Sequence, residues 1–527
     1  MEQIDNLIKG KGLHIALIML TFFVIYRMFV IGSIHSQREL PIEVDDAYVY
    51  ISQAHMFYDN YDRTKETTSS IQSIAQLTFK NDTSDSIQNV SRYYAWVADQ
   101  FYFLYSATFG FFTEILDIDP VKVSWVFAYV TQFLIALSVI LIAGLYLGGT
   151  SLQFVVAVIL SAFVSVEFTH QINATPFTIA NAILLIGWWA INVNRLKNRV
   201  RWLFGGLLIA LSLHIHPGAF VVLGLLSATA LIIWVWKNNT EQKSVFFYTV
   251  FIVLATALIE NFVFYIMNGE RYLSLINTET LASTRHQMSV LELITFNFWE
   301  TFSRLINFSN FLSVRSGYLS LYLYLFALFS LFFLNRKLLI VNIVFLLGTV
   351  TGLLHYVPGH KGELIEYVGQ TQIIVMAMAF SVFYVYIFNT LKRHKKYYLH
   401  YGFITILALS FLVKNLTSTV SQIDKRAKRH NFPNQVEEIK EFSNNLPQGT
   451  SLIVGDEFVY IMLLSEVDDR SIVLADHMRK NGIWSVPKNI PRPSGYIGKP
   501  VNKVLVGGIP YNINNNNNKR IIFSSVD

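Results

Sequence analysis

The chain contains no cysteine among its 527 residues. Disulfides, thiolate nucleophiles and cysteine-ligated metals are therefore excluded. Charged residues are also scarce, at 14% of the chain, whereas a soluble protein has about 25%. The composition is instead 53% hydrophobic and 15% aromatic. It predicts a polytopic α-helical membrane protein.

Eleven apolar segments approach the roughly 20 residues that a membrane helix needs. We expect spans at 13–34, 121–147, 152–168, 177–193, 202–216, 218–236, 245–267, 317–334, 338–355, 371–390 and 397–415. The first segment is too long for the apolar part of a signal peptide, and no small-residue cleavage site follows it. We interpret it as an uncleaved first span.

Lysine and arginine are concentrated in short loops that alternate along the chain. These loops hold Lys9 and Lys11, the basic group at 195–201, Lys237 and Lys243, Arg336 and Lys337, and the basic group at 392–396. Because short basic loops stay on the cytoplasmic side, we predict a multi-pass protein of the plasma or inner membrane. Its N-terminus is cytoplasmic and its C-terminal region is extracytoplasmic. The same loops explain the net charge of +6, so no nucleic-acid partner is expected.

Two stretches outside the spans are long enough to have structure of their own. The first outer loop, 35–120, holds two aromatic amphipathic segments, 46–58 and 86–105, which are typical of helices lying at the membrane interface. After residue 420 the composition becomes soluble-like. Short apolar runs there predict one helix and four strands, and we interpret the asparagine run as a turn; these elements are 436–446, 451–454, 471–474, 503–506, 521–523 and 514–518. We therefore expect a transmembrane domain at 1–420 and a small α/β extracytoplasmic domain at 421–527.

Two adjacent carboxylates, Asp45 and Asp46, lie about ten residues beyond the first apolar segment, within the stretch 43–50. Aromatic and β-branched residues follow them rather than a solvated linker. A carboxylate close to the hydrocarbon boundary is costly to hold there. The pair either caps a helix at the interface or carries out chemistry.

Two further short motifs lie at predicted outer ends of spans. The sequence Asn173-Ala174-Thr175-Pro176 opens the fourth span, shortly after Glu167 and His170. The sequence 214–218 contains His214 and His216 and is followed directly by a span. If the two histidines lie on an extended segment, their side chains face the same side. They then hold a structural turn, contact a phosphate or sugar, or bind a metal.

These motifs, together with the topology, resemble the GT-C superfamily of polyprenyl-phosphate-sugar-dependent glycosyltransferases. The residues that carry the resemblance are 44–48, 173–176 and 214–218; as architecture it extends over the whole chain. It implies an enzyme that moves a sugar from a polyprenyl-phosphate donor in the bilayer to a lipid, glycan or protein acceptor, with inversion. It also implies that Asp45 or Asp46 is the catalytic base, and that Glu167 belongs to a second acidic loop. No metal ligand set is evident, and the resemblance leaves dependence on a divalent metal open.

A leaving lipid phosphate needs cations close to it. His360, Lys361 and Glu363 lie in a glycine-containing outer loop, and Arg285 with His286 lie in the preceding outer loop. We expect the donor phosphate at one of these loops. The alternative is that both loops are hydrated and that their charged side chains contact lipid headgroups.

Two other classes of function compete with the transferase. A transporter or flippase places ionisable residues near the middle of its spans; Arg27 and Glu260 are the main ones here. A polysaccharide polymerase or ligase is expected to have an arginine-rich outer loop. The loop 268–316 contains Arg271, Arg285, Arg304 and Arg315, so this alternative stays open.

Overall fold

The computed structural model describes most of the predicted spans and part of the C-terminal region. The described residues are 12–37, 120–164, 175–193, 198–216, 218–268, 321–354, 363–393, the strands between 452 and 525, and some single residues elsewhere. The chain divides into two compact units. One contains residues 1–33 and 128–425, and the other contains 34–127 and 426–527.

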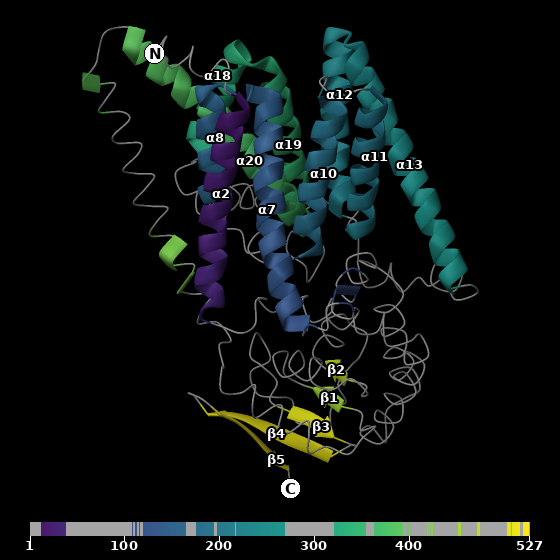
Figure 1. The fold of residues 1–527 in the computed structure, drawn as a ribbon. Helices are drawn as coiled ribbons and strands as arrows, with labels where there is room; N and C mark the ends of the chain where they lie inside the picture. The colour runs from purple at the N-terminus through teal and green to yellow at the C-terminus, as the bar shows by residue number, and fades with distance from the viewer. Residues whose placement is uncertain are drawn as a thin grey trace. The chain divides into compact units, whose positions relative to one another are not determined.

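The first unit is helical (Figure 1). Its helices are α2 (Gly12–His35), α7 (Pro120–Leu147), α8 (Leu152–Val164), α10 (Pro176–Asn192), α11 (Asn198–Ile215), α12 (Gly218–Lys237), α13 (Thr240–Asn268), α18 (Leu321–Leu334), α19 (Arg336–Leu354) and α20 (Glu363–Arg393). The last residues of α2 and the first residues of α7 are assigned to the second unit. Ten of the eleven predicted spans thus coincide with described helices. The eleventh, 397–415, lies outside the described residues except for three positions.

Five of the described helical segments are long and apolar enough to cross a membrane. They are Gly12–His35, Lys122–Leu147, Gly218–Lys237, Thr240–Ile259 and Thr371–Leu391. Three shorter apolar helices accompany them. Large apolar side chains such as Leu13, Leu203 and Leu258 are about three-quarters exposed. Exposed apolar side chains on such helices are what contact with lipid requires, so the chain is a membrane protein.

Helix α20 is central in the helical unit. Every side chain from Thr371 to Val382 is buried, and a helix that is buried on all sides lies inside its bundle. It packs against α8, α12, α18 and α19. Helix α13 has the opposite character, because it packs on α11 and α12 at one edge of the helical unit (Figure 1), and only 22% of its apolar window within Thr240–Ile259 is buried.

Helices α10 and α11 approach each other through two glycines. A Cβ atom built on Gly187 would lie 3.0 Å from the carbonyl oxygen of Gly205 and 2.9 Å from Ile209. A Cβ on Gly205 would overlap the side chain of Ile191. Small residues allow membrane helices to pack closely where no hydrophobic force drives them together. These glycines therefore set the spacing of the pair.

The second unit contains a five-stranded sheet. Its strands are β1 (Leu452–Val454), β2 (Ile472–Leu474), β3 (Lys503–Val506), β4 (Ile509–Asn516) and β5 (Arg520–Ser525), in the order β2-β1-β3-β4-β5. The β1–β2 pair is parallel and the other pairs are antiparallel. The four predicted strands are all present.

The asparagine run was predicted as a turn, and that prediction is wrong for its first half. Residues Asn514, Asn515 and Asn516 belong to β4 and pair with Ile522, Ile521 and Arg520 of β5. Backbone pairing with an apolar partner strand outweighs the low strand propensity of asparagine. The predicted helix at 436–446 and the predicted interfacial segments at 46–58 and 86–105 lie outside the described residues.

Candidate functional site

Most of the predicted site residues lie outside the part of the chain that the structure describes. These are Asp45, Asp46, Glu167, His170, Arg285, His286, His360 and Lys361. Glu363 is the first residue of α20. His214 and His216 are described in full.

The two histidines do not lie on an extended segment, which was the condition for their side chains to face the same side. His214 belongs to the last turn of α11, and His216 follows the end of that helix. His216 is only 3% exposed. Its Nδ1 atom accepts a hydrogen bond from the backbone N–H of Gly218 at 2.8 Å. Of the alternatives considered for the pair, this geometry favours the structural turn for His216.

The turn at His216 packs against the beginning of α10. The ring of Phe177 meets the His216 ring edge-on, with centroids 5.3 Å apart. Helix α10 begins at Pro176, and the side chain of Thr175 caps it by accepting a hydrogen bond from the backbone N–H of Thr178. Proline is favoured at the first helical position because the missing N–H has no partner there. A helix therefore begins at Pro176, where the motif 173–176 predicted one, and its first turn lies against His216, between α11 and α12.

A buried hydrogen-bonded pair then links α10 to α20. The Nδ2 atom of Asn181 donates to Thr371 Oγ1 at 2.9 Å, and the Thr371 hydroxyl is 3.1 Å from Asn181 Oδ1. Both side chains are buried. Because Phe177 and Asn181 are four residues apart, they share one face of α10. That face of α10 therefore contacts both the turn at His216 and the beginning of the buried segment of α20.

The next residue of α20 continues the polar layer towards α18 and α19. Gln372 Nε2 donates to the Tyr324 hydroxyl at 2.9 Å, and this hydroxyl donates to Asn342 Oδ1 at 2.9 Å. Asn342 Nδ2 in turn donates to the Leu338 carbonyl oxygen. The Gln372 Oε1 atom is buried and accepts no hydrogen bond. Together with the Asn181–Thr371 pair, these groups make five neutral polar side chains that link four helices and fix how far the helices are shifted along one another. The helices are α10, α18, α19 and α20.

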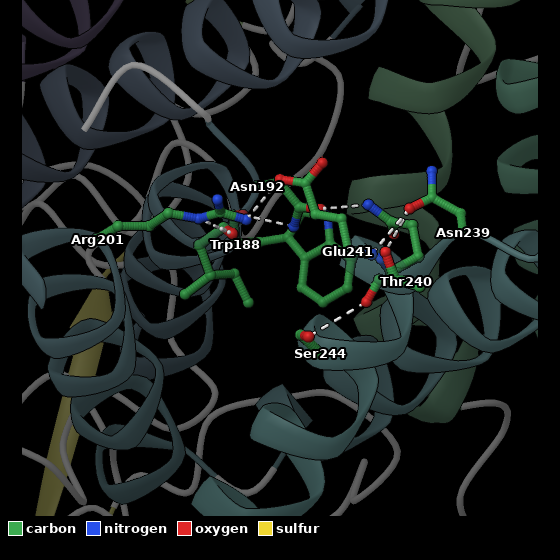
Figure 2. Close-up of polar contacts among 9 residues, drawn as sticks. Trp188, Asn192, Arg201, Asn239, Thr240, Glu241 and Ser244 are labelled. Carbon is green, nitrogen blue, oxygen red and sulfur yellow. Dashed lines mark hydrogen bonds and ion pairs between the residues drawn. The ribbon is translucent and has the colours of Figure 1, made fainter. Parts of the chain in front are cut away.

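A second polar cluster lies at the opposite end of α10 (Figure 2). Arg201 of α11 donates from Nε to the Ile191 carbonyl oxygen at 2.6 Å and from a terminal nitrogen to Glu241 at 2.9 Å. Gln242 donates to Asn192 at 3.1 Å. The Arg201 cation bonds to the Ile191 carbonyl oxygen in the last turn of α10, where the helix dipole favours positive charge. Arg201, predicted only as part of a basic loop, therefore joins α10, α11 and α13.

The described residues offer no cluster of three or more histidine, aspartate or glutamate side chains that could hold a metal ion. Apart from Arg27, Arg201 and His216, their buried polar side chains are amides and hydroxyls, which can position helices but are poor bases at neutral pH. The catalytic groups of a transferase would have to come from the segments at the helix ends.

Sequence reasoning missed the pairs Asn181–Thr371 and Gln372–Tyr324. A signal was present, because Asn181 and Tyr324 lie within the apolar runs of predicted spans, and Thr371 and Gln372 begin the predicted span 371–390. Polar residues inside membrane helices usually face other helices. The partner of each residue could not be read from the sequence, since the members of the first pair are 190 positions apart.

The chain was compared with known proteins. No family model and no curated protein matches it. Among the solved structures that match is the crystal structure of the Archaeoglobus fulgidus oligosaccharyltransferase, tethered through a disulfide to an acceptor peptide containing the NVT sequon. The match covers 87% of this chain and 64% of that chain, with 11% identity and a TM-score of 0.49. The chain therefore spans less than two thirds of that structure, and a likeness at this level assigns neither a fold nor an activity.

Proposed function

We propose that the protein is a membrane-embedded glycosyltransferase of the GT-C kind. It transfers a sugar from a polyprenyl-phosphate donor to an acceptor on the extracytoplasmic face of the membrane. The observation that carries the proposal is the pair Asp45-Asp46, placed about ten residues beyond the end of α2 at His35. A carboxylate pair at that place can receive a proton at the edge of the bilayer, where a lipid-linked substrate is held.

The resemblance to the GT-C superfamily implies the reaction. An acceptor hydroxyl or amide attacks the anomeric carbon of the sugar, and Asp45 or Asp46 takes its proton. The new bond to carbon forms as the bond between that carbon and the phosphate oxygen breaks, so the sugar inverts and the lipid phosphate leaves with the electron pair. Cations in the segment before α20 (His360, Lys361) or in the 268–316 loop (Arg285, His286) stabilise the departing phosphate.

A transporter is disfavoured by the surroundings of Arg27. Transporters use ionisable residues in the middle of spans to line a water-filled path. The Arg27 side chain is 1% exposed and bonds to Gln132 on another helix. A side chain that is buried and bonded in this way links two helices and does not line a water-filled path.

Replacing Asp45 and Asp46 singly with Asn tests the proposal. We expect one replacement to lower transfer from a polyprenyl-phosphate sugar in vesicles by about 10²–10⁴-fold, the usual contribution of a general base. Asp424→Asn is the matched control, because it makes the same chemical change at an exposed aspartate. Membrane levels of all variants are measured alongside.

Three other results would refute the proposal. Wild-type transfer in both single variants would remove the base. Donor that crosses the membrane without reacting would indicate a transporter. A ladder of products with many sugars would indicate a polymerase or ligase.

A further inference from the structure

The turn between α12 and α13 is short, and its own hydrogen bonds fix it. Both flanking helical segments are long and apolar enough to cross a membrane, so the turn lies at a membrane surface. Asn238 has a left-handed backbone conformation, with φ at 49°. The N–H of Asn239 donates to the Trp234 carbonyl oxygen at 3.3 Å, which ends α12 as a Schellman cap does. Asn239 Oδ1 then caps α13 by accepting from the Glu241 N–H at 3.0 Å, and the two helix ends have a fixed relative position.

Two exposed lysines lie on either side of this turn. Lys237 is the last residue of α12, and Lys243 belongs to the first turn of α13. The Lys243 Nζ atom lies 5.4 Å from the centre of the Trp234 ring, within the range at which a ring attracts a cation. The Trp234 ring is itself packed against the Phe247 ring, with centroids 5.7 Å apart. The charge of Lys243 is therefore held over an aromatic surface.

The acidic residue of the turn does not cancel the lysine charges. Glu241 is the only carboxylate between residues 234 and 248, and it pairs with Arg201 of α11 at 2.9 Å (Figure 2). The Arg201 side chain is only 6% exposed, so one negative charge is matched by one nearly buried positive charge. The surface of the turn therefore keeps the positive charge of both lysines.

An exposed apolar stripe continues from Lys243 along α13. Phe247, Phe251, Leu254 and Leu258 follow it at intervals of three or four residues and therefore share one face of the helix. Each of these four side chains is at least half exposed. The stripe ends 15 residues after Lys243, and at 1.5 Å per residue it is about 22 Å long. That length exceeds the roughly 15 Å of hydrocarbon in one leaflet, so the chains of a lipid fit along it with the headgroup at Lys243.

We propose that the α12–α13 turn binds an anionic phospholipid, with the lipid phosphate at Lys237 and Lys243 and the acyl chains along the apolar stripe of α13. The chemistry of the turn selects the class of lipid. Basic side chains at the ends of membrane helices attract anionic headgroups, whereas a zwitterionic headgroup carries an ammonium that the lysines repel. The binding is separate from sugar transfer and does not rest on the proposed function.

Lipid binding to the full-length protein in detergent micelles tests the proposal. The probes are dioctanoyl phosphatidylglycerol, which is anionic, and dioctanoyl phosphatidylcholine, which is zwitterionic; native mass spectrometry counts the bound molecules. We expect phosphatidylglycerol to bind more tightly. Lys237→Gln and Lys243→Gln should each raise its Kd about fivefold, the usual effect of one basic residue at an anionic surface.

Three further variants separate a defined site from diffuse attraction. Lys337→Gln is the matched control, because it removes an exposed lysine at the beginning of another helix, α19, and should change the Kd less than twofold. Trp234→Leu keeps both lysines of the turn and removes the ring beside Lys243. It should raise the Kd about two- to fivefold, the usual contribution of such a contact, and Trp234→Phe should restore most of the loss.

Three results would overturn the proposal. Equal Kd values for the two lipids would show that charge does not select the ligand. Equal effects of Lys243→Gln and Lys337→Gln would indicate general attraction by surface charge. Wild-type binding in Trp234→Leu would show that the ring does not hold the lysine in place. None of these measurements involves a sugar, so the inference and the proposed function can fail independently.

Discussion

Removing the Thr371 hydroxyl provides the sharpest test of the polar layer that joins α10 to α20. Thr371→Val keeps the shape of the side chain and deletes both hydrogen bonds to Asn181. Bonds between membrane helices contribute about 0.6 kcal/mol on average and at most about 1.7. The variant also leaves a buried amide without partners, which costs about 1–3 kcal/mol. We expect a loss of about 1–3 kcal/mol in the free energy of unfolding.

The double variant Asn181→Leu with Thr371→Val should be less harmful than the sum of the two single changes. Replacing both partners by apolar groups leaves no orphaned polar atom, so the two changes should couple by about 0.5–3 kcal/mol. The measurement is unfolding of the protein in mixed detergent micelles, followed by the loss of helical signal.

Thr390→Val is the matched control on the same helix. The hydroxyl of Thr390 is exposed and bonds only to the Tyr386 carbonyl oxygen one turn away, so its loss should change stability by less than about 0.5 kcal/mol. Equal stability of Thr371→Val and Thr390→Val would refute the reasoning. Strict additivity in the double variant would refute it as well, because the pair would then not interact.

Two further predictions use the same unfolding measurement. Gly205→Leu should cost about 1–3 kcal/mol or prevent folding, because a Cβ there overlaps α10, as in other overpacked interiors; Gly224→Ala, where nothing lies within 4 Å of the added Cβ, should be harmless, and equal effects would contradict the close approach. Tyr324→Phe should cost about 1–3 kcal/mol, since it removes the hydroxyl between Gln372 and Asn342. Gln372→Met should cost less, because its Oε1 atom already accepts no hydrogen bond; the reverse order would contradict the described network.

The location of the candidate site could be predicted only as a set of segments. The sequence indicated that Asp45, Glu167 and His360 lie near ends of spans, because the change from apolar to polar composition is visible. It did not reveal that the His216 side chain stabilises the turn in which it lies by accepting a hydrogen bond from the backbone N–H of Gly218. That contact depends on a helix end at Ile215 and on the nearby ring of Phe177. The assignment of Asp45 and Asp46 as base stays a prediction.

The asparagine run illustrates the limit of local reasoning about the fold. Its composition favours a turn, yet Asn514, Asn515 and Asn516 lie in β4 and pair with Ile522, Ile521 and Arg520 of β5. The pairing energy comes from residues further along the chain, and a short window cannot include it.

The sequence by itself determined which of the described segments form apolar helices, because a membrane helix needs about 20 mostly apolar residues and the composition displays such runs directly. It also determined where α10 begins, since the cap Thr175 and Pro176 act on the neighbouring turn. Only the tertiary structure decided the partners Asn181 with Thr371 and Arg27 with Gln132. Lipid gives apolar helix faces no preference for one neighbour over another, so the order of the helices in space is fixed by a few polar bonds and close glycine contacts between residues far apart in the chain.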